Sequence, residues 1–152
     1  MRFGLVILLL TTFVSPVSAS EWPQWGGPNR DFTVEAADLA EAAVAHGPYR
    51  VVQRVWQARE PGELRALAQE LMRRSGVVAL LAGIGERTHL CFACAEGVDL
   101  DVASLLREAC AQLEGKGGGQ PHMAQGSAPP ADVFRVETVF TDLLASLASH
   151  NR

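Results

Sequence analysis

The order of helical and strand patterns along the chain is the feature that most restricts its fold. Residues 49–57, which read YRVVQRVWQ, are rich in β-branched and aromatic side chains and predict a strand. Runs at 76–82 and 88–95 predict two further strands, joined by a hairpin turn. Helices are predicted over 34–46, 61–74, 99–113 (capped by Asp101) and 132–149. This α-β-α-β-β-α-loop-α order predicts an α/β fold, in which helices pack on a small mixed sheet and a glycine-rich loop precedes the C-terminal helix.

The length and composition of the chain allow one modest domain with a hydrophobic core. The chain has 152 residues, of which 48% are hydrophobic and 20% charged, and its formal net charge is −4. A negative net charge gives no overall basic field for nucleic acid, so binding of that kind requires a local basic patch.

Residues 1–19 have the pattern of a secretory signal peptide. Arg2 is their only charge, an apolar run follows, and Val17-Ser18-Ala19 offers small residues at a cleavage site. Cleavage there leaves 12 basic and 17 acidic side chains, a net charge of −5. The sequence therefore predicts an exported, periplasmic protein with no membrane segment after cleavage. An uncleaved interfacial anchor and a misassigned start codon are the alternatives.

The next segment, residues 20–33, reads SEWPQWGGPNRDFT and predicts an ordered loop or a short edge strand. Its WPQWGGPNR stretch resembles the opening of exported quinoprotein (PQQ-like) β-propellers. No blade repeats follow, and a propeller requires at least four blades. The domain predicted for residues 34–150 is therefore not a propeller.

The three cysteines do not show whether the protein is in an oxidising or a reducing compartment. Cys91 and Cys94 lie on one predicted strand, where side chains three residues apart point to opposite faces and can neither pair nor share a metal. We interpret both as buried apolar residues. The four histidines are scattered and do not form a metal-ligand pattern.

Residues 115–126, GKGGGQPHMAQG, carry the clearest functional signal. Five of the twelve are glycines, which let a ligand approach the backbone and let successive N–H groups form an anion-binding nest. Lys116 adds a positive charge, and Gln120, His122 and Gln125 add hydrogen-bond donors. The stretch lacks the G-x-x-x-x-G-K-[ST] pattern of a P-loop. From composition alone, a flexible connector between helices is as good an interpretation as a phosphate site.

The run LEGKGGGQPHMAQGSAPP resembles the signature of the DHH-associated C-terminal domain of alanyl-tRNA synthetases and alanyl-tRNA editing proteins. The preceding FACAEGVDLDVASLLREACAQL is similar to the strand, turn and helix that lead into that signature, and the likeness covers residues 34–149. The matching signature positions are Gly115, Lys116, Gly117, Gly118, Gly119, Pro121, Ala124, Gln125 and Gly126.

This resemblance implies a non-catalytic module that contacts tRNA outside its acceptor end or supports pairing of two subunits in a homodimer. It implies phosphate contacts, with no cofactor or metal, from Lys116, Gly117, Gly118, Gly119, Gln120, His122 and Gln125. Arg50 and Arg54, on one strand face, are predicted to assist. Glu114, Gln120 and Ser127 depart from the family pattern. The added Glu114 and the loss of a cation at Gln120 weaken the electrostatics expected for phosphate contact.

Two other functions remain open at the level of sequence. The first is an exported structural or interaction protein without an RNA function, or a fused or truncated gene product. The second is an enzyme acting through the glycine stretch, although no paired carboxylates, activated nucleophile or metal ligands accompany it. The families also differ in location, because the alanyl-tRNA proteins are cytoplasmic whereas the signal peptide predicts export.

Overall fold

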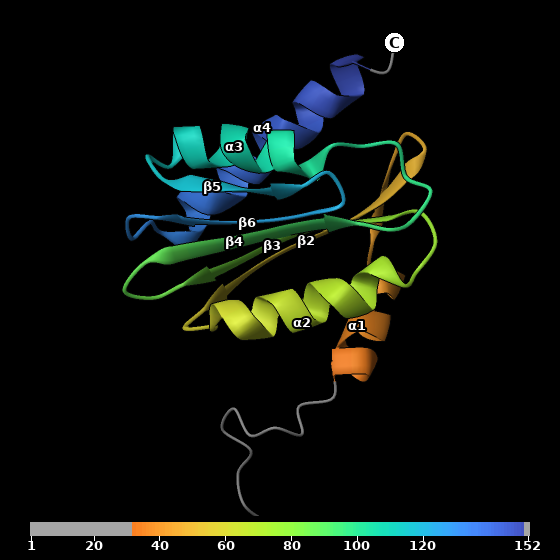
Figure 1. Cartoon of the computed structure of the whole chain (residues 1–152), viewed down its shortest axis with the longest axis horizontal. Helices are drawn as coiled ribbons and strands as arrows, with labels where there is room; N and C mark the ends of the chain where they lie inside the picture. The colour runs from red at the N-terminus through yellow and green to blue at the C-terminus, as the bar shows by residue number, and fades with distance from the viewer. Residues whose placement is uncertain (1–31, 151–152) are drawn as a thin grey trace, which may run out of the picture. The chain divides into compact units, whose positions relative to one another are not determined.

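The computed structural model describes residues 32–150, in which a six-stranded sheet lies between two layers of helices (Figure 1). The strand order is β1-β2-β3-β4-β6-β5, and all neighbours are antiparallel except β2 and β3. The elements are α1 (Phe32–Glu41), β1 (Val44–His46), β2 (Tyr49–Gln57), α2 (Pro61–Met72), β3 (Val77–Ile84), β4 (Thr88–Cys94), α3 (Val102–Gln112), β5 (Lys116–Gln120), β6 (Met123–Ala128) and α4 (Val133–His150). The predicted α/β class, a mixed sheet with helices packed on it, is confirmed.

Each face of the sheet has its own hydrophobic core. One core joins the sheet to α1 and α2, and the other joins it to α3 and α4. β3 and β4 are buried on both faces, which explains why their sequences read as continuous apolar runs. Cys91 lies in the first core and Cys94 in the second, as free thiols, so the prediction that they are buried on opposite faces is confirmed.

Helix α3 begins where the sequence predicted. The Asp101 carboxylate accepts hydrogen bonds from the N–H groups of Ala103 and Ser104, at 3.0 and 3.3 Å, and from the Ser104 hydroxyl at 2.8 Å. These contacts satisfy N–H groups that have no partner within the helix.

The predicted helix over 34–46 is partly wrong. Helix α1 starts at Phe32 and ends at Glu41, and Val44–His46 form the edge strand β1 instead. Gly47 adopts a positive φ of 59°, which allows a tight turn and pairs Val44 with Val51 on β2. Pairing with β2 therefore outweighs the helix propensity of the alanine-rich segment.

The predicted glycine-rich loop is also wrong. Lys116–Gln120 and Met123–Ala128 are strands β5 and β6, joined by a two-residue turn at Pro121 and His122. Glycine is one of the least favourable residues in a strand, so local propensity did not predict this hairpin. The predicted signal peptide and most of the propeller-like segment lie outside the described residues.

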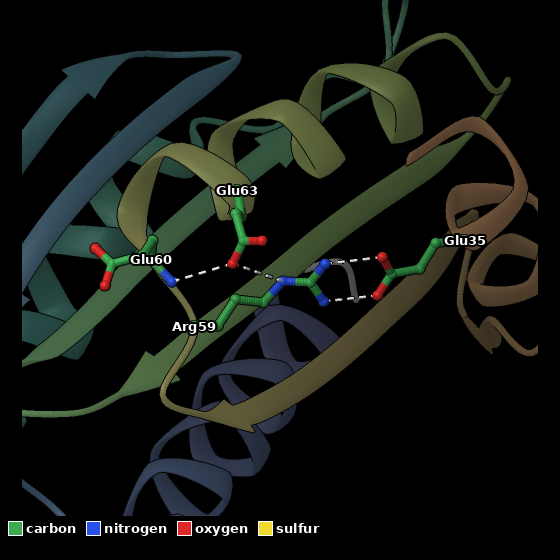
Figure 2. Close-up of polar contacts among 4 residues, drawn as sticks. All are labelled: Glu35, Arg59, Glu60 and Glu63. Atoms are coloured by element: carbon green, nitrogen blue, oxygen red, sulfur yellow. Dashed lines mark hydrogen bonds and ion pairs between the residues drawn. The ribbon is translucent and has the colours of Figure 1, made fainter. Parts of the chain in front are cut away.

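A partly buried ion pair holds α1 against the rest of the fold (Figure 2). The Arg59 guanidinium donates two hydrogen bonds to the Glu35 carboxylate, at 2.6 and 2.8 Å, and lies over the Trp56 ring at 4.4 Å. The Arg59 side chain is only 4% exposed. Glu63, 3.9 Å from Arg59 Nε, also accepts a hydrogen bond from the Glu60 N–H at the start of α2.

Candidate nucleic-acid interface

Four glycines let the β5–β6 hairpin pack closely on itself and on α3. A Cβ atom on Gly117 would lie 2.6 Å from the Cα of Gly126 and 3.0 Å from Leu106 of α3. Equivalent atoms on Gly115 and Gly119 would lie 2.5 Å from carbonyl oxygens of β6, and one on Gly126 would lie 2.6 Å from the Cys110 sulfur. These glycines are therefore required by packing, whatever the hairpin binds.

Gly118 differs from the other glycines of the hairpin. A Cβ atom there would meet nothing within 4 Å, and its φ lies outside the left-handed region. It alternates with Gly117 and Gly119, so it faces the opposite side of the sheet from α3. Packing and backbone conformation do not require a glycine at this position, which leaves a flat, open spot on the sheet surface.

The strand register aligns the polar residues of this open face in rows across three strands. His89 of β4 pairs with Ser127 of β6, and Ser127 pairs with Lys116 of β5. In the next row, Cys91 pairs with Gln125, which pairs with Gly118. Lys116 and Gln125, two predicted site residues, are thus brought to one face.

These rows form the floor of an open groove beside the first turn of α2. The groove has a volume of about 340 Å³ and is lined by Pro61, Leu64, His89, Leu90, Cys91, Lys116, Gln125, Gly126 and Ser127. Its polar side chains are available to a ligand because Lys116 and Gln125 are exposed and His89 and Ser127 are half-buried.

Two arginines add positive charge around the groove. Arg87, in the β3–β4 turn, donates a hydrogen bond from Nε to the Ser127 hydroxyl at 2.8 Å. Arg65 is an exposed residue of α2 whose charge acts on the Cys91 thiol of the groove lining. Burial raises the pKa of Cys91 to about 11, against smaller lowering effects of the Gln125 hydrogen bond and the Arg65 charge. Lys116 and the two arginines therefore create a local basic patch on an acidic protein.

The remaining predicted site residues do not all join this patch. Gly117 and Gly119 face α3, and Gln120 ends β5 two residues beyond Gly118. His122 is in the hairpin turn and lines a separate cavity of about 460 Å³ with Glu96, Cys94 and Pro121. Along β6, His122 in this turn lies roughly 17 Å from Ser127.

Arg50 and Arg54 are also separate from the hairpin, contrary to the prediction that they assist it. Both are on β2, and β3, β4 and β6 lie between that strand and β5. At about 4.8 Å per strand, the separation approaches 20 Å. Arg50 instead donates a hydrogen bond to the Ala40 carbonyl at 2.6 Å, which ties β2 to α1.

Sequence reasoning missed Arg65, Arg87, His89 and Ser127. The β4–β6 pairing brings His89 and Arg87 to the hairpin from about forty residues away, and no local pattern marks that pairing. Ser127 is the exception, since it lies within the recognised signature and was noted there only as a departure from the family pattern.

The described part of the chain offers no metal centre: among residues 32–150, no three His, Cys, Asp or Glu side chains gather closely enough to hold an ion. Over the same residues, no helix combines the length and apolar character needed to cross a bilayer.

Residues 48–146, well over half of the chain, match the DHHA1 domain family. The chain belongs to this family. The DHHA1 match includes the hairpin, the groove and both arginines beside it. Helix α1 and strand β1 precede it.

The DHHA1 region is similar to segments of alanine–tRNA ligases. It is 39% identical over 82 residues to the ligase of Methanoregula boonei, covering 54% of this chain and 8% of that protein. It is 36% identical over 101 residues to the ligase of Shewanella amazonensis, covering 63% and 12%. The chain thus spans only about a tenth of the length of these relatives.

A solved structure shares the fold. The C-Ala domain from Aquifex aeolicus alanyl-tRNA synthetase aligns with a TM-score of 0.61 at 24% sequence identity. The alignment covers 67% of this chain and 96% of that domain, so this chain contains nearly the whole C-Ala fold.

Proposed function

We propose that this DHHA1 domain is a non-catalytic module that binds the phosphate backbone of tRNA on the open face of β4, β6 and β5. The observation that carries the proposal is the row His89–Ser127–Lys116, with Arg87 hydrogen-bonded to Ser127. It places the cations Lys116 and Arg87 and two further hydrogen-bond donors, His89 and Ser127, on one surface. The similarity to alanine–tRNA ligases supports tRNA as the nucleic acid.

The chemistry of the groove favours contacts with phosphates over reading of bases. Lysine and arginine attract phosphate without regard to sequence, and the flat surface at Gly118 lets a backbone come close. The groove lining contains no aromatic ring except the His89 imidazole. Stacking platforms for single-stranded bases use several aromatic rings. We therefore expect binding that depends on salt and tolerates changes of base sequence.

The test is the affinity of the purified full-length chain for tRNA, measured by fluorescence anisotropy over a range of salt concentrations. Each phosphate contact that is lost reduces the slope of log K against log salt by about 0.7–0.9. Lys116→Ala and Arg87→Ala should each weaken binding severalfold at low salt and reduce the slope by about that amount.

Arg54→Ala is the matched control, because it removes one exposed cation from the same sheet at a distance from the groove. Its affinity and salt slope should equal those of the unmodified chain. Equal losses in all three variants would mean that tRNA responds only to net charge, and the proposed interface would be wrong.

We also propose that the chain is exported, on the basis of the leader-like residues 1–19. Mass spectrometry of the protein recovered from a bacterial host tests this directly. A product that begins at Ser20 in the periplasmic fraction is expected. A full-length product in the cytoplasm would contradict export without affecting the proposed interface.

A further inference from the structure

The side-chain amide of Gln125 is held in one orientation on the floor of the groove. Gln125 is exposed on β6, and its register partners are Cys91 on β4 and Gly118 on β5. Its nitrogen Nε2 donates a hydrogen bond to the sulfur of Cys91, 3.9 Å away, and Cys91 is buried in the core beneath α2. The nitrogen and oxygen of an amide lie on different sides of its carbon, so the oxygen Oε1 is directed away from Cys91. No hydrogen bond from elsewhere in residues 32–150 reaches Oε1.

An oxygen that accepts hydrogen bonds does not suit a phosphate. The oxygens of a phosphodiester also only accept, so they repel Oε1 rather than bind it. The one donor on the backbone of RNA is the 2′-hydroxyl of the ribose, which DNA lacks. The neighbouring row of Lys116 and Ser127 has the opposite chemistry, because an ammonium and a hydroxyl donate to phosphate. The groove therefore presents donors in one row and an acceptor in the next.

The spacing of these two rows fits adjacent groups on one RNA strand. Gln125 and Ser127 are two residues apart on β6, which separates them by about 7 Å on the same face. A ribose and its phosphate are neighbours on the strand, so the two rows can contact both together. Gly118 lies beside Gln125, and a Cβ atom on Gly118 would meet nothing within 4 Å. This bare stretch of backbone leaves room for the sugar ring.

We propose that Gln125 Oε1 accepts a hydrogen bond from a ribose 2′-hydroxyl while Lys116 and Ser127 hold the adjacent phosphate. This role rests on the proposed function, because a ribose reaches Gln125 only when a phosphate is bound beside it. Gln125 is then the residue through which the groove selects RNA over DNA without reading bases.

The test compares a tRNA transcript with the same sequence in which 2′-fluoro groups replace the 2′-hydroxyls. Fluorine preserves the sugar conformation of RNA but has no hydrogen to donate. Fluorescence anisotropy at low salt measures the affinity of the full-length chain for both. The unmodified chain should bind the hydroxyl form about three- to tenfold more tightly, as expected for one neutral hydrogen bond.

Gln125→Leu removes the acceptor and keeps a side chain of similar size at an exposed position. It should weaken binding of the hydroxyl form by that same factor and leave the affinity for the fluoro form unchanged. Gln112→Leu is the matched control, because this exposed glutamine ends α3 on the opposite face of the sheet. It should keep the preference in full. A preference that survives in Gln125→Leu would overturn the proposal.

Lys116→Ala separates this inference from the proposed function. It should weaken binding of both tRNA forms by equal factors, since the phosphates are the same in both. Binding that depends on Lys116 but is equal for the two forms in the unmodified chain would overturn the role of Gln125 and leave the proposed function intact. Absence of binding of either form at low salt would contradict both.

Discussion

Gly117 lies opposite Gly126 in the β5–β6 ladder, so close that a Cβ atom on Gly117 would come within 2.6 Å of the Cα of Gly126. Gly118, the next residue, has open space where its side chain would be. Neighbouring glycines in one motif thus have different roles. One is required by the packing of the hairpin, and the other leaves a surface free.

This difference predicts opposite effects of two alanine substitutions. Gly117→Ala should lower the free energy of unfolding by about 2–3 kcal/mol, because the backbone of β6 must move to admit the methyl group. Gly118→Ala should raise it by roughly 0.5 kcal/mol, since alanine loses less backbone entropy on folding. Urea denaturation measures both, and similar losses in the two variants would show that Gly118 is also packed.

The pair of buried Arg59 and half-buried Glu35 should contribute much of the attachment of α1. Glu35→Ala leaves the almost fully buried guanidinium without its two strongest acceptors and should cost about 2–3 kcal/mol of unfolding free energy. Glu70→Ala is the control, since its partner Arg73 has a side chain that is 76% exposed, and it should change stability by less than about 1 kcal/mol. Equal losses of unfolding free energy in Glu35→Ala and Glu70→Ala would mean that α1 is held mainly by apolar contacts.

The cap of α3 predicts a dependence of stability on acid. Hydrogen bonds from the Ser104 hydroxyl, and then from the backbone N–H groups, hold the pKa of Asp101 below its ordinary value of 3.8. The cap therefore stabilises the folded protein fully at pH values above 3.8. This stabilisation is lost as the pH falls through the lower pKa that Asp101 has in the folded protein. Asp101→Asn removes this titration. The stability difference between the two proteins should be constant near neutral pH and shrink in acid, and a difference independent of pH would exclude the cap as its source.

The three thiols should be unreactive in the folded protein. Burial raises the pKa of all three, and that of Cys91 reaches about 11. At pH 8 only about one Cys91 in a thousand would be the reactive thiolate. Labelling with iodoacetamide followed by mass spectrometry should show almost no modification in buffer and three modified cysteines in urea. Rapid labelling of one native cysteine would reveal an opening of the sheet near it.

Patterns carried by side chains predicted most of the fold. The apolar runs of β2, β3 and β4, the stripe of α4 and the Asp101 cap lie where periodicity and capping placed them. The failures occur where long-range pairing outweighs local preference. Val44–His46 lies in an alanine-rich segment that favours a helix, yet it pairs with β2 as a strand. The glycine-rich residues Lys116–Gln120 form a strand only because β6 pairs with them.

The candidate site could be predicted only in part for the same reason. Lys116 and Gln125 were found because they belong to a contiguous motif. Arg87 and His89 come to the hairpin through the pairing of β4 with β6. His122, although within the motif, is at the far end of β6, because an extended strand separates residues that a compact loop would bring together.

The most direct test of the account is a nuclear magnetic resonance titration of the isotope-labelled chain with tRNA. The amide signals of Arg87, His89, Lys116, Gly118, Gln125 and Ser127 should shift together, and those of Glu96 and His122 at the other end of the sheet should not. Shifts confined to α3 and α4, or no shifts at low salt, would contradict the proposal that the open face of β4, β6 and β5 binds nucleic acid.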